Sequence, residues 1–192
     1  LGYRIKLLGI TKRAERFDAN GKAVGGVELR VHPSLVPAKR LIANVEGAMN
    51  AVLVQGDAVG ATLYYGKGAG AEPTASAVIA DLVDVTRLHT SDPEHRVPHL
   101  AFQPDQIAEL PMLPIDEVET SYYLRLRVQD KPGVLADITR ILADQSISID
   151  AMLQREPEEG ESQTDIIILT HLTIEKNMNA AIAKVESLDS VT

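Results

Sequence analysis

The sequence predicts an α+β protein with two successive domains, and three patterns support this class. Alternating apolar and polar residues around turn residues predict two β-hairpins in residues 3 to 65. A glycine-rich stretch then leads into apolar residues at helical spacing, up to Arg87. Residues 121 to 192 follow a separate order of strand, helix, strand, strand and helix.

The first hairpin is predicted at residues 3 to 17 and 22 to 32, around the turn signal DANG at 18 to 21. A short helix is expected at 39 to 43. The second hairpin is predicted at 48 to 55 and 58 to 65, flanking Gly56 and Asp57. This order is typical of an open mixed sheet with helices on one face.

Residues 65 to 87 combine alternating glycines with a proline at a helix start. Glycine permits positive φ and close approach of the backbone, and Pro73 suits a first helical turn. The spacing GxGxG differs from the dinucleotide fingerprint GxGxxG, so the motif taken alone also fits a tight turn before a core helix.

Residues 89 to 120 are predicted to form a proline-rich linker, with one short helix at 103 to 110. His95 and His99 have the spacing of a metal pair on a helix. Pro98 interrupts that turn and no third ligand is evident, so no metal site is expected.

A strand is predicted at 122 to 128, followed by a turn in which Asp130 caps the next helix and Pro132 occupies its first turn. The helix runs from Val134 to Leu142. Strands are expected at 147 to 153 and 166 to 172, joined by a solvated acidic loop at 156 to 161, and a second helix contains residues 178 to 185. This βαββα order lacks one strand of the ferredoxin-like βαββαβ unit, and the missing strand is expected to start near Ser190.

Composition narrows the classes of function. The chain has 192 residues, 45% of them hydrophobic, a net charge of −8 and no cysteine. Scattered basic residues argue against nucleic-acid binding, and no apolar run has the length of a membrane span. The amino terminus lacks an initiator Met and a signal peptide, so we expect the chain to begin within a longer polypeptide of the cytoplasm.

The segments GYRIKLLGITKR, NAVLVQGDAVG and GKGAGAEPTASAV, in this order, resemble the substrate and dimerisation domain of homoserine dehydrogenases. The resemblance assigns residues 1 to 88 to the last part of that domain. It implies a homodimer and a cofactor, NADP or NAD, held mainly by sequence upstream of Leu1. The implied cofactor-binding residues in this chain are Gly66, Gly68, Ala69, Gly70 and Thr74.

The segment VQDKPGVLADITRILADQSISIDAMLQRE resembles the ACT domain, a fold that binds amino acids where two copies pair side by side. The resemblance covers residues 121 to 192. The N–H groups at a helix start suit an amino-acid carboxylate, and Asp130 suits its ammonium group. The implied effector-binding residues are Asp130, Gly133, Val134, Leu135, Ser148 and Gln154; many ACT domains have Asn in place of Ser148.

Together the resemblances imply a bacterial homoserine dehydrogenase with an appended ACT domain. Its reaction is NAD(P)-dependent interconversion of aspartate 4-semialdehyde and homoserine, on the route to threonine, methionine and isoleucine. Threonine is the expected feedback effector. The family's catalytic residues match positions upstream of Leu1, so we expect this chain alone to be inactive.

Two alternatives remain open. The first is a non-enzymatic ACT protein that binds amino acids, with residues 1 to 88 as a scaffold. The second is the regulatory region of an aspartate kinase, in which the glycine stretch and NAVLVQGDAVG have no place.

Overall fold

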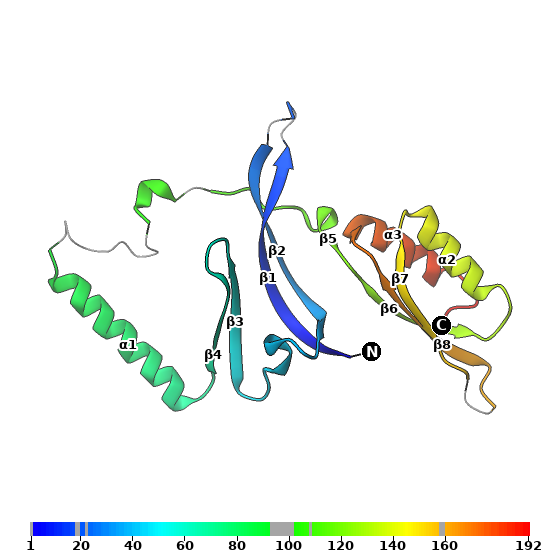
Figure 1. Ribbon diagram of the computed structural model, residues 1–192, viewed down its shortest axis with the longest axis horizontal. Coiled ribbons are helices and arrows are strands. Elements are labelled where there is room, and N and C mark those ends of the chain that lie inside the picture. The colour runs from blue at the N-terminus through cyan, green and yellow to red at the C-terminus, as the bar shows by residue number, and fades with distance from the viewer. Residues whose placement is uncertain (1, 18–19, 22, 93–101, 108, 158–159) are drawn as a thin grey trace. The chain divides into compact units, whose positions relative to one another are not determined.

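A computed structural model describes residues 2–17, 20–21, 23–92, 102–107, 109–157 and 160–192 (Figure 1). The chain divides into two compact units. Unit 1 contains residues 1–8 and 32–109, and unit 2 contains residues 9–31 and 110–192. The predicted α+β class is confirmed.

The first predicted hairpin is present. Strands β1 (Tyr3–Phe17) and β2 (Ala23–Pro37) are hydrogen-bonded neighbours in a two-stranded sheet. β2 continues five residues beyond the predicted end, since Pro33 and Pro37 are tolerated in a strand that has a free edge. The predicted helix at 39 to 43 is a short 3-10 helix, η1 (Leu41–Asn44).

The second predicted hairpin is also confirmed. β3 (Met49–Gly56) and β4 (Gly60–Lys67) pair antiparallel, with Met49 opposite Lys67 and Gly56 opposite Gly60. Large apolar side chains are exposed along this ribbon, among them Val52 and Tyr64. In the described residues the two hairpins are separate two-stranded sheets and are not joined into the open sheet expected from the sequence.

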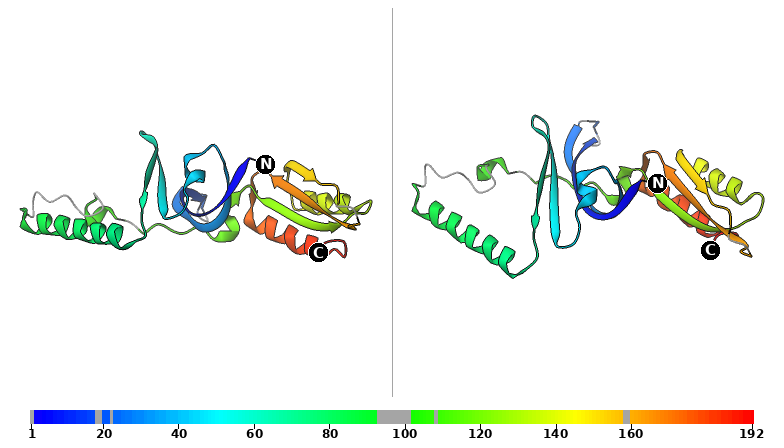
Figure 2. Two further views of the ribbon diagram at one scale, coloured as in Figure 1. Left: turned by 90° about the horizontal axis from the view of Figure 1, so that it is seen from below. Right: turned by 60° about the horizontal axis from the view of Figure 1, so that its bottom comes forward.

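Helix α1 (Ala71–Thr90) follows β4 as one uninterrupted helix (Figure 2). It extends two residues into the predicted linker. None of its side chains is buried. Val78, Ile79 and Leu82 form an apolar stripe, and each of them is more than half exposed. The helix expected at 103 to 110 is reduced to the 3-10 turn η3 (Pro104–Gln106).

Unit 2 contains the predicted βαββα order. Its elements are β6 (Tyr123–Gln129), α2 (Val134–Asp144), β7 (Ile149–Gln154), β8 (Gln163–Thr170) and α3 (Glu175–Glu186). The strands form an antiparallel sheet in the order β6-β8-β7, with β8 in the centre. The observed β8 begins three residues and ends two residues before the predicted strand at 166 to 172.

The core of unit 2 lies between this sheet and the two helices. Alternate residues of β8 are buried, including Ile166 and Ile168, and they meet Ile138 and Leu142 of α2 and Met178 of α3. Full burial of such side chains stabilises a fold by about 1.5–3 kcal/mol each.

The chain also begins the predicted final strand. Gln129 donates its N–H to the oxygen of Ser190 at 2.8 Å, and Thr192 donates to the oxygen of Arg127 at 2.9 Å. Val128 and Val191 form an antiparallel bridge between them. The structure therefore has an isolated bridge at the place where this strand is expected to start, on the edge of β6 away from β8.

Residues 110 to 120 are part of unit 2 and are held at both ends. Val27 of β2 donates its N–H to the Pro111 oxygen at 3.0 Å and accepts the Leu113 N–H at 2.8 Å. After the 3-10 turn η4 (Ile115–Glu117), Val118 is fully buried. The two-residue strand β5 (Glu119–Thr120) then pairs with β9 (Thr173–Ile174), a contact absent from the sequence prediction.

None of the helices that the structure describes is long and apolar enough to cross a membrane.

Candidate functional site

The glycine-rich stretch forms the turn from β4 into α1. Gly70 has φ of 126° directly before the helix, a conformation that side-chain-bearing residues avoid. A Cβ atom on Gly68 would lie 2.5 Å from Nδ2 of Asn50. Gly70 therefore has a conformational reason to be glycine, whereas a side chain at Gly68 would only require the end of the Asn50 side chain to move.

The remaining predicted cofactor residues surround this turn. Gly66 is in β4 opposite Asn50, and Ala69 and Thr74 are exposed. Thr74 donates its N–H to the Gly70 oxygen at 3.1 Å, which closes the first turn of α1. The same turn carries Glu72 and the N–H-free Pro73, so it is poorly suited to a phosphate and better suited to an uncharged group.

His95 and His99 lie outside the described residues. Across the described ranges, no three side chains of His, Cys, Asp or Glu gather as metal ligands would.

The second candidate site is the turn from β6 to α2. Gly133 is the residue before α2, with φ of 97°, and the helix start has no side-chain cap. Asp130 is therefore not the helix cap that the sequence suggested, and Pro132 lies before the helix instead of in its first turn. A glycine in this conformation sets the turn by itself, because it needs no side-chain hydrogen bond.

This turn offers backbone donors to a ligand. Within the described part of the chain, the N–H groups of Gly133 and Leu135 make no hydrogen bond. The Val134 N–H points at the Lys131 oxygen across a long 3.4 Å. Asp130 is exposed beside these donors, and its own N–H bonds the Ser162 oxygen at 2.9 Å.

The structure does not bring all the predicted effector residues together. The turn at Asp130 lies at the end of the sheet where Gln129 pairs with Gln163. Ser148 lies at the opposite end, where its oxygen accepts the His171 N–H at 2.9 Å. The eight residues of β8 separate these ends by about 25 Å.

Strand β7 forms one edge of the sheet and carries both Gln154 and exposed apolar residues. Met152 is 46% exposed and Leu153 is 40% exposed. In the described residues only β8 pairs with β7, so the other edge of β7 has unpaired backbone groups. Such an edge is a template for pairing with another strand.

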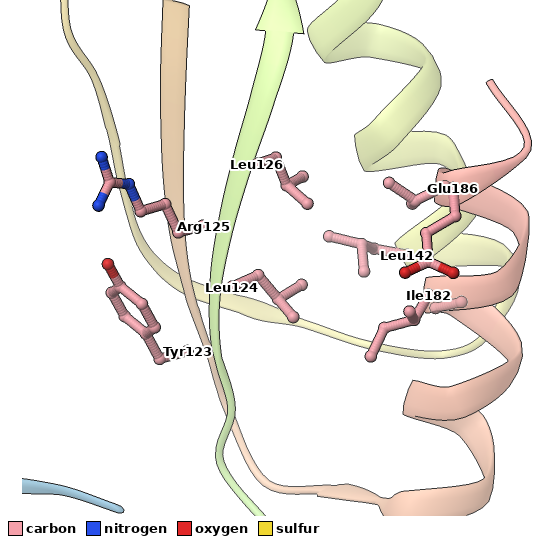
Figure 3. Close-up of a pocket in the computed structure, with 9 residues that line it drawn as sticks. Tyr123, Leu124, Arg125, Leu126, Leu142, Ile182 and Glu186 are labelled. Atoms are coloured by element: carbon pink, nitrogen blue, oxygen red, sulfur yellow. The ribbon is translucent and has the colours of Figure 1, made fainter. Parts of the chain in front are cut away.

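A cavity of about 220 Å³ lies between β6 and the helices α2 and α3 (Figure 3). Leu124 and Leu126 point into it from β6, facing Leu142 and Ile182, while Tyr123 and Arg125 project from the other side of the strand. None of the predicted effector residues lines this cavity. The cavity lies beside residues 123–126 of β6, whereas residues 127–129 of the same strand are hydrogen-bonded to residues 190–192.

Two polar clusters in unit 2 have no local sequence signature. On the sheet surface, Asp165 contacts Arg125 at 2.6 Å and Arg127 at 3.3 Å, and these hydrogen bonds hold the pKa of the Asp165 carboxyl below its ordinary value, with Arg125 the larger cause. Beneath the sheet end, the Tyr122 hydroxyl donates to Glu175. Burial, and then this bond, raise the pKa of Tyr122 well above its ordinary value.

The fold of unit 2 and its β6–α2 turn define a ferredoxin-like domain of the ACT type, joined to an α+β segment that ends in an exposed helix. Residues 1–83 match the family description homoserine dehydrogenase, and residues 122–190 match the ACT domain. The two segments are therefore similar to those two families.

Individual relatives cover the whole chain. The homoserine dehydrogenase of Pseudomonas aeruginosa is 56% identical over 192 residues, and that of Neisseria gonorrhoeae is 53% identical over 191 residues. Each match covers 100% of this chain and 42% of the relative. The crystal structure of a homoserine dehydrogenase from Thiobacillus denitrificans is 71% identical with a TM-score of 0.84, and the match covers 100% of this chain and 41% of that one. The chain thus spans about two fifths of these proteins.

Proposed function

We propose that this chain is part of a homoserine dehydrogenase that interconverts aspartate 4-semialdehyde and homoserine with NADP or NAD, under amino-acid control. The observation that carries the proposal is that one chain matches both families. A homoserine dehydrogenase also matches this chain over all of its 192 residues, across both segments. When bound, the cofactor supplies or accepts the hydride.

Unit 1 supports this role because its apolar surfaces need further protein to cover them. The chain exposes 14285 Å². Two separate folded domains of half its mass would expose about 11,000 Å² in total. The exposed stripe of α1 and the exposed residues of β3 and β4 account for part of this excess, and we propose that they pack on upstream sequence and on a second copy.

The glycine turn supports a role beside the cofactor. Gly68 and Gly70 keep the backbone free of side chains, and Ala69 and Thr74 are exposed. Because Glu72 and Pro73 make the helix start unsuitable for phosphate, we propose that the turn contacts the nicotinamide and its ribose. The domain boundaries that follow are 1–88 for this part, 89–120 for the linker and 121–192 for the ACT domain.

Unit 2 supports amino-acid sensing by a pair of ACT domains. If two β7 edges pair antiparallel about a two-fold axis, the start of one strand lies beside the end of the other. Ser148 of the second copy is then brought toward Gln154 and the donors of Gly133 and Leu135. The effector site is complete only in the pair, and the expected effector is L-threonine.

The experiment is an assay of the complete source polypeptide with reduced nicotinamide cofactor and aspartate 4-semialdehyde, with and without millimolar L-threonine. The 192-residue chain is assayed in parallel. We expect cofactor oxidation by the complete polypeptide, suppression by threonine, and no turnover by the 192-residue chain.

Absence of turnover in the complete polypeptide, with threonine binding retained, would favour the non-enzymatic ACT protein. Turnover that threonine leaves unchanged would keep the dehydrogenase assignment and reject threonine as effector. Turnover by the 192-residue chain would contradict the placement of the catalytic residues upstream.

A further inference from the structure

We propose that residues 110–120, here called the strap, couple the ACT fold to strand β2, and that the Tyr122–Glu175 hydrogen bond holds the strap on the ACT fold while the buried Glu28–Arg30 ion pair stabilises the part of β2 that carries Val27. The inference deepens the proposed amino-acid control and rests on it for its regulatory meaning. It assigns the route by which the state of the ACT fold reaches β2, a strand of the segment that matches homoserine dehydrogenase.

The first step is the attachment of the strap to β2. Val27 uses both its backbone groups on the strap, donating to Pro111 at 3.0 Å and accepting from Leu113 at 2.8 Å. Val27 and Met112 thereby form a parallel bridge. A residue bonded through both groups fixes the register of the strap against β2, and β2 itself continues from unit 2 into unit 1.

The second step is the attachment of the strap to the ACT fold. Val118 has no exposed surface, and its oxygen accepts the N–H of Glu175, the first residue of α3, at 2.8 Å. β5 extends this contact by pairing with β9 just before α3. A displacement of α3 therefore moves the strap, because Val118 has no free surface along which to slide.

The third step is the polar cluster at the same place. The Tyr122 hydroxyl donates to Glu175, and Thr170 Oγ1 accepts the Tyr122 N–H at 2.9 Å, so Tyr122 ties β8 to the start of α3. On β2, Arg30 Nε lies 2.9 Å from Oε1 of Glu28, and both side chains are more than nine-tenths buried. Lys12 of β1 lies 3.6 Å from the same oxygen.

This ion pair joins two residues of β2 itself, so it stabilises the strand segment beside Val27, because separating its members leaves an uncompensated charge away from water. Coupling requires two states with different affinity for the effector. The structure shows the attached state, and the other state is one in which Val27 releases the strap.

The test is hydrogen exchange of the complete polypeptide in three variants. Tyr122→Phe removes the donor to Glu175 and keeps the ring, and Arg30→Met removes the buried cation while keeping a long side chain. Arg125→Met is the matched control, since it removes an arginine from the exposed pair with Asp165 in the same unit. Glu175→Gln, which weakens the same bond by replacing the charged acceptor of Tyr122 with a neutral one, replaces Tyr122→Phe if that variant folds poorly.

We expect exchange of the peptides containing the Val27 and Leu113 amides to rise at least about fivefold in Tyr122→Phe and Arg30→Met, and to stay unchanged in Arg125→Met. Threonine affinity should remain within about twofold in Tyr122→Phe, because the variant keeps the bond of the residue 122 N–H to Thr170 and removes only the hydroxyl that bonds Glu175, while the threonine-dependent inhibition should fall at least about fivefold.

Unchanged exchange at Val27 and Leu113 in both Tyr122→Phe and Glu175→Gln would overturn the coupling, whatever threonine does. Increased exchange in a protein that threonine never inhibits would support the coupling and reject the proposed effector. The two proposals can therefore fail separately.

Discussion

Asp165 shows how a single residue responds to its surroundings on the sheet. Its carboxylate accepts hydrogen bonds from Arg125 and Arg127, which are two residues apart on the neighbouring strand. Both arginines keep their charge at every pH where the protein is folded. The carboxylate is the member of the cluster whose charge changes in acid.

This gives a pH-dependent prediction for Asp165→Asn. Because the pKa of Asp165 is lowered on folding from 3.8, the carboxylate contributes stability above that pH and loses it as the pH falls through the folded value. We expect Asp165→Asn to be less stable than the unmodified protein at pH 6, with a difference that shrinks as the pH falls below 3.8 and the carboxyl becomes protonated. Urea unfolding at several pH values measures the difference, with the exposed Asp189→Asn as control. A difference that persists unchanged at pH 2 would contradict the assignment.

At the residue scale, the sequence predicted turn residues better than long-range polar pairs. Gly70 and Gly133 were identified from their place before helices, since the requirement for glycine is local. Glu28 with Arg30, and Tyr122 with Glu175, could not be identified, because Tyr122 and Glu175 meet only through the folded sheet and burial of Glu28 depends on distant segments. The prediction that Asp130 caps α2 was wrong, because Gly133 is the residue before the helix and no side chain caps the helix start.

Among the elements, β8 organises unit 2 because it is central in the sheet and has two different faces. Ile168 is completely buried against the helices, whereas Ile167, its neighbour, lies partly exposed on the other face. The two residues have the same side chain, so they form a natural pair for comparison.

We predict that Ile168→Ala lowers the free energy of unfolding by about 2–4 kcal/mol, because it leaves a cavity in the core. Ile167→Ala should cost less than about 1.5 kcal/mol, since water can occupy the vacated space on the sheet surface. Urea unfolding followed by circular dichroism gives both values. Equal losses in the two variants would mean that the assignment of faces is wrong.

The prediction of helices and strands succeeded where apolar residues recur at helical or strand spacing over several residues. The strand and helix order of unit 2, both hairpins and the start of α1 all followed from apolar spacing. The two-residue pairing of β5 with β9 is too short to show a period. The end of α1 at Thr90 and the end of β2 at Pro37 were misplaced, because boundaries depend on contacts beyond the local sequence.

At the scale of the whole molecule, the proposed effector site requires two copies. Met152→Lys places a charge on the exposed edge strand β7 and should prevent edge pairing, because charged edge residues block strand addition. In the complete polypeptide we expect threonine affinity to fall at least about tenfold, measured by calorimetry, together with a lower molar mass in light scattering. Leu172→Lys, a change at an exposed residue outside β7, is the control. Unchanged affinity and mass in Met152→Lys would reject pairing through β7.

The placement of residues 9–31 and 110–192 in one unit has a consequence for chimeric enzymes. An ACT domain cut out at residue 121 leaves behind Val118, which has no exposed surface, and the partners of Val27 on the strap. Grafting it onto a foreign dehydrogenase therefore transfers the proposed effector-binding residues without the strap that anchors them to β2. A graft that begins at residue 110 includes the strap. It also needs a host strand with the equivalents of Val27, Glu28 and Arg30, so we expect regulation to transfer only when residues 110–192 and this part of β2 are moved together.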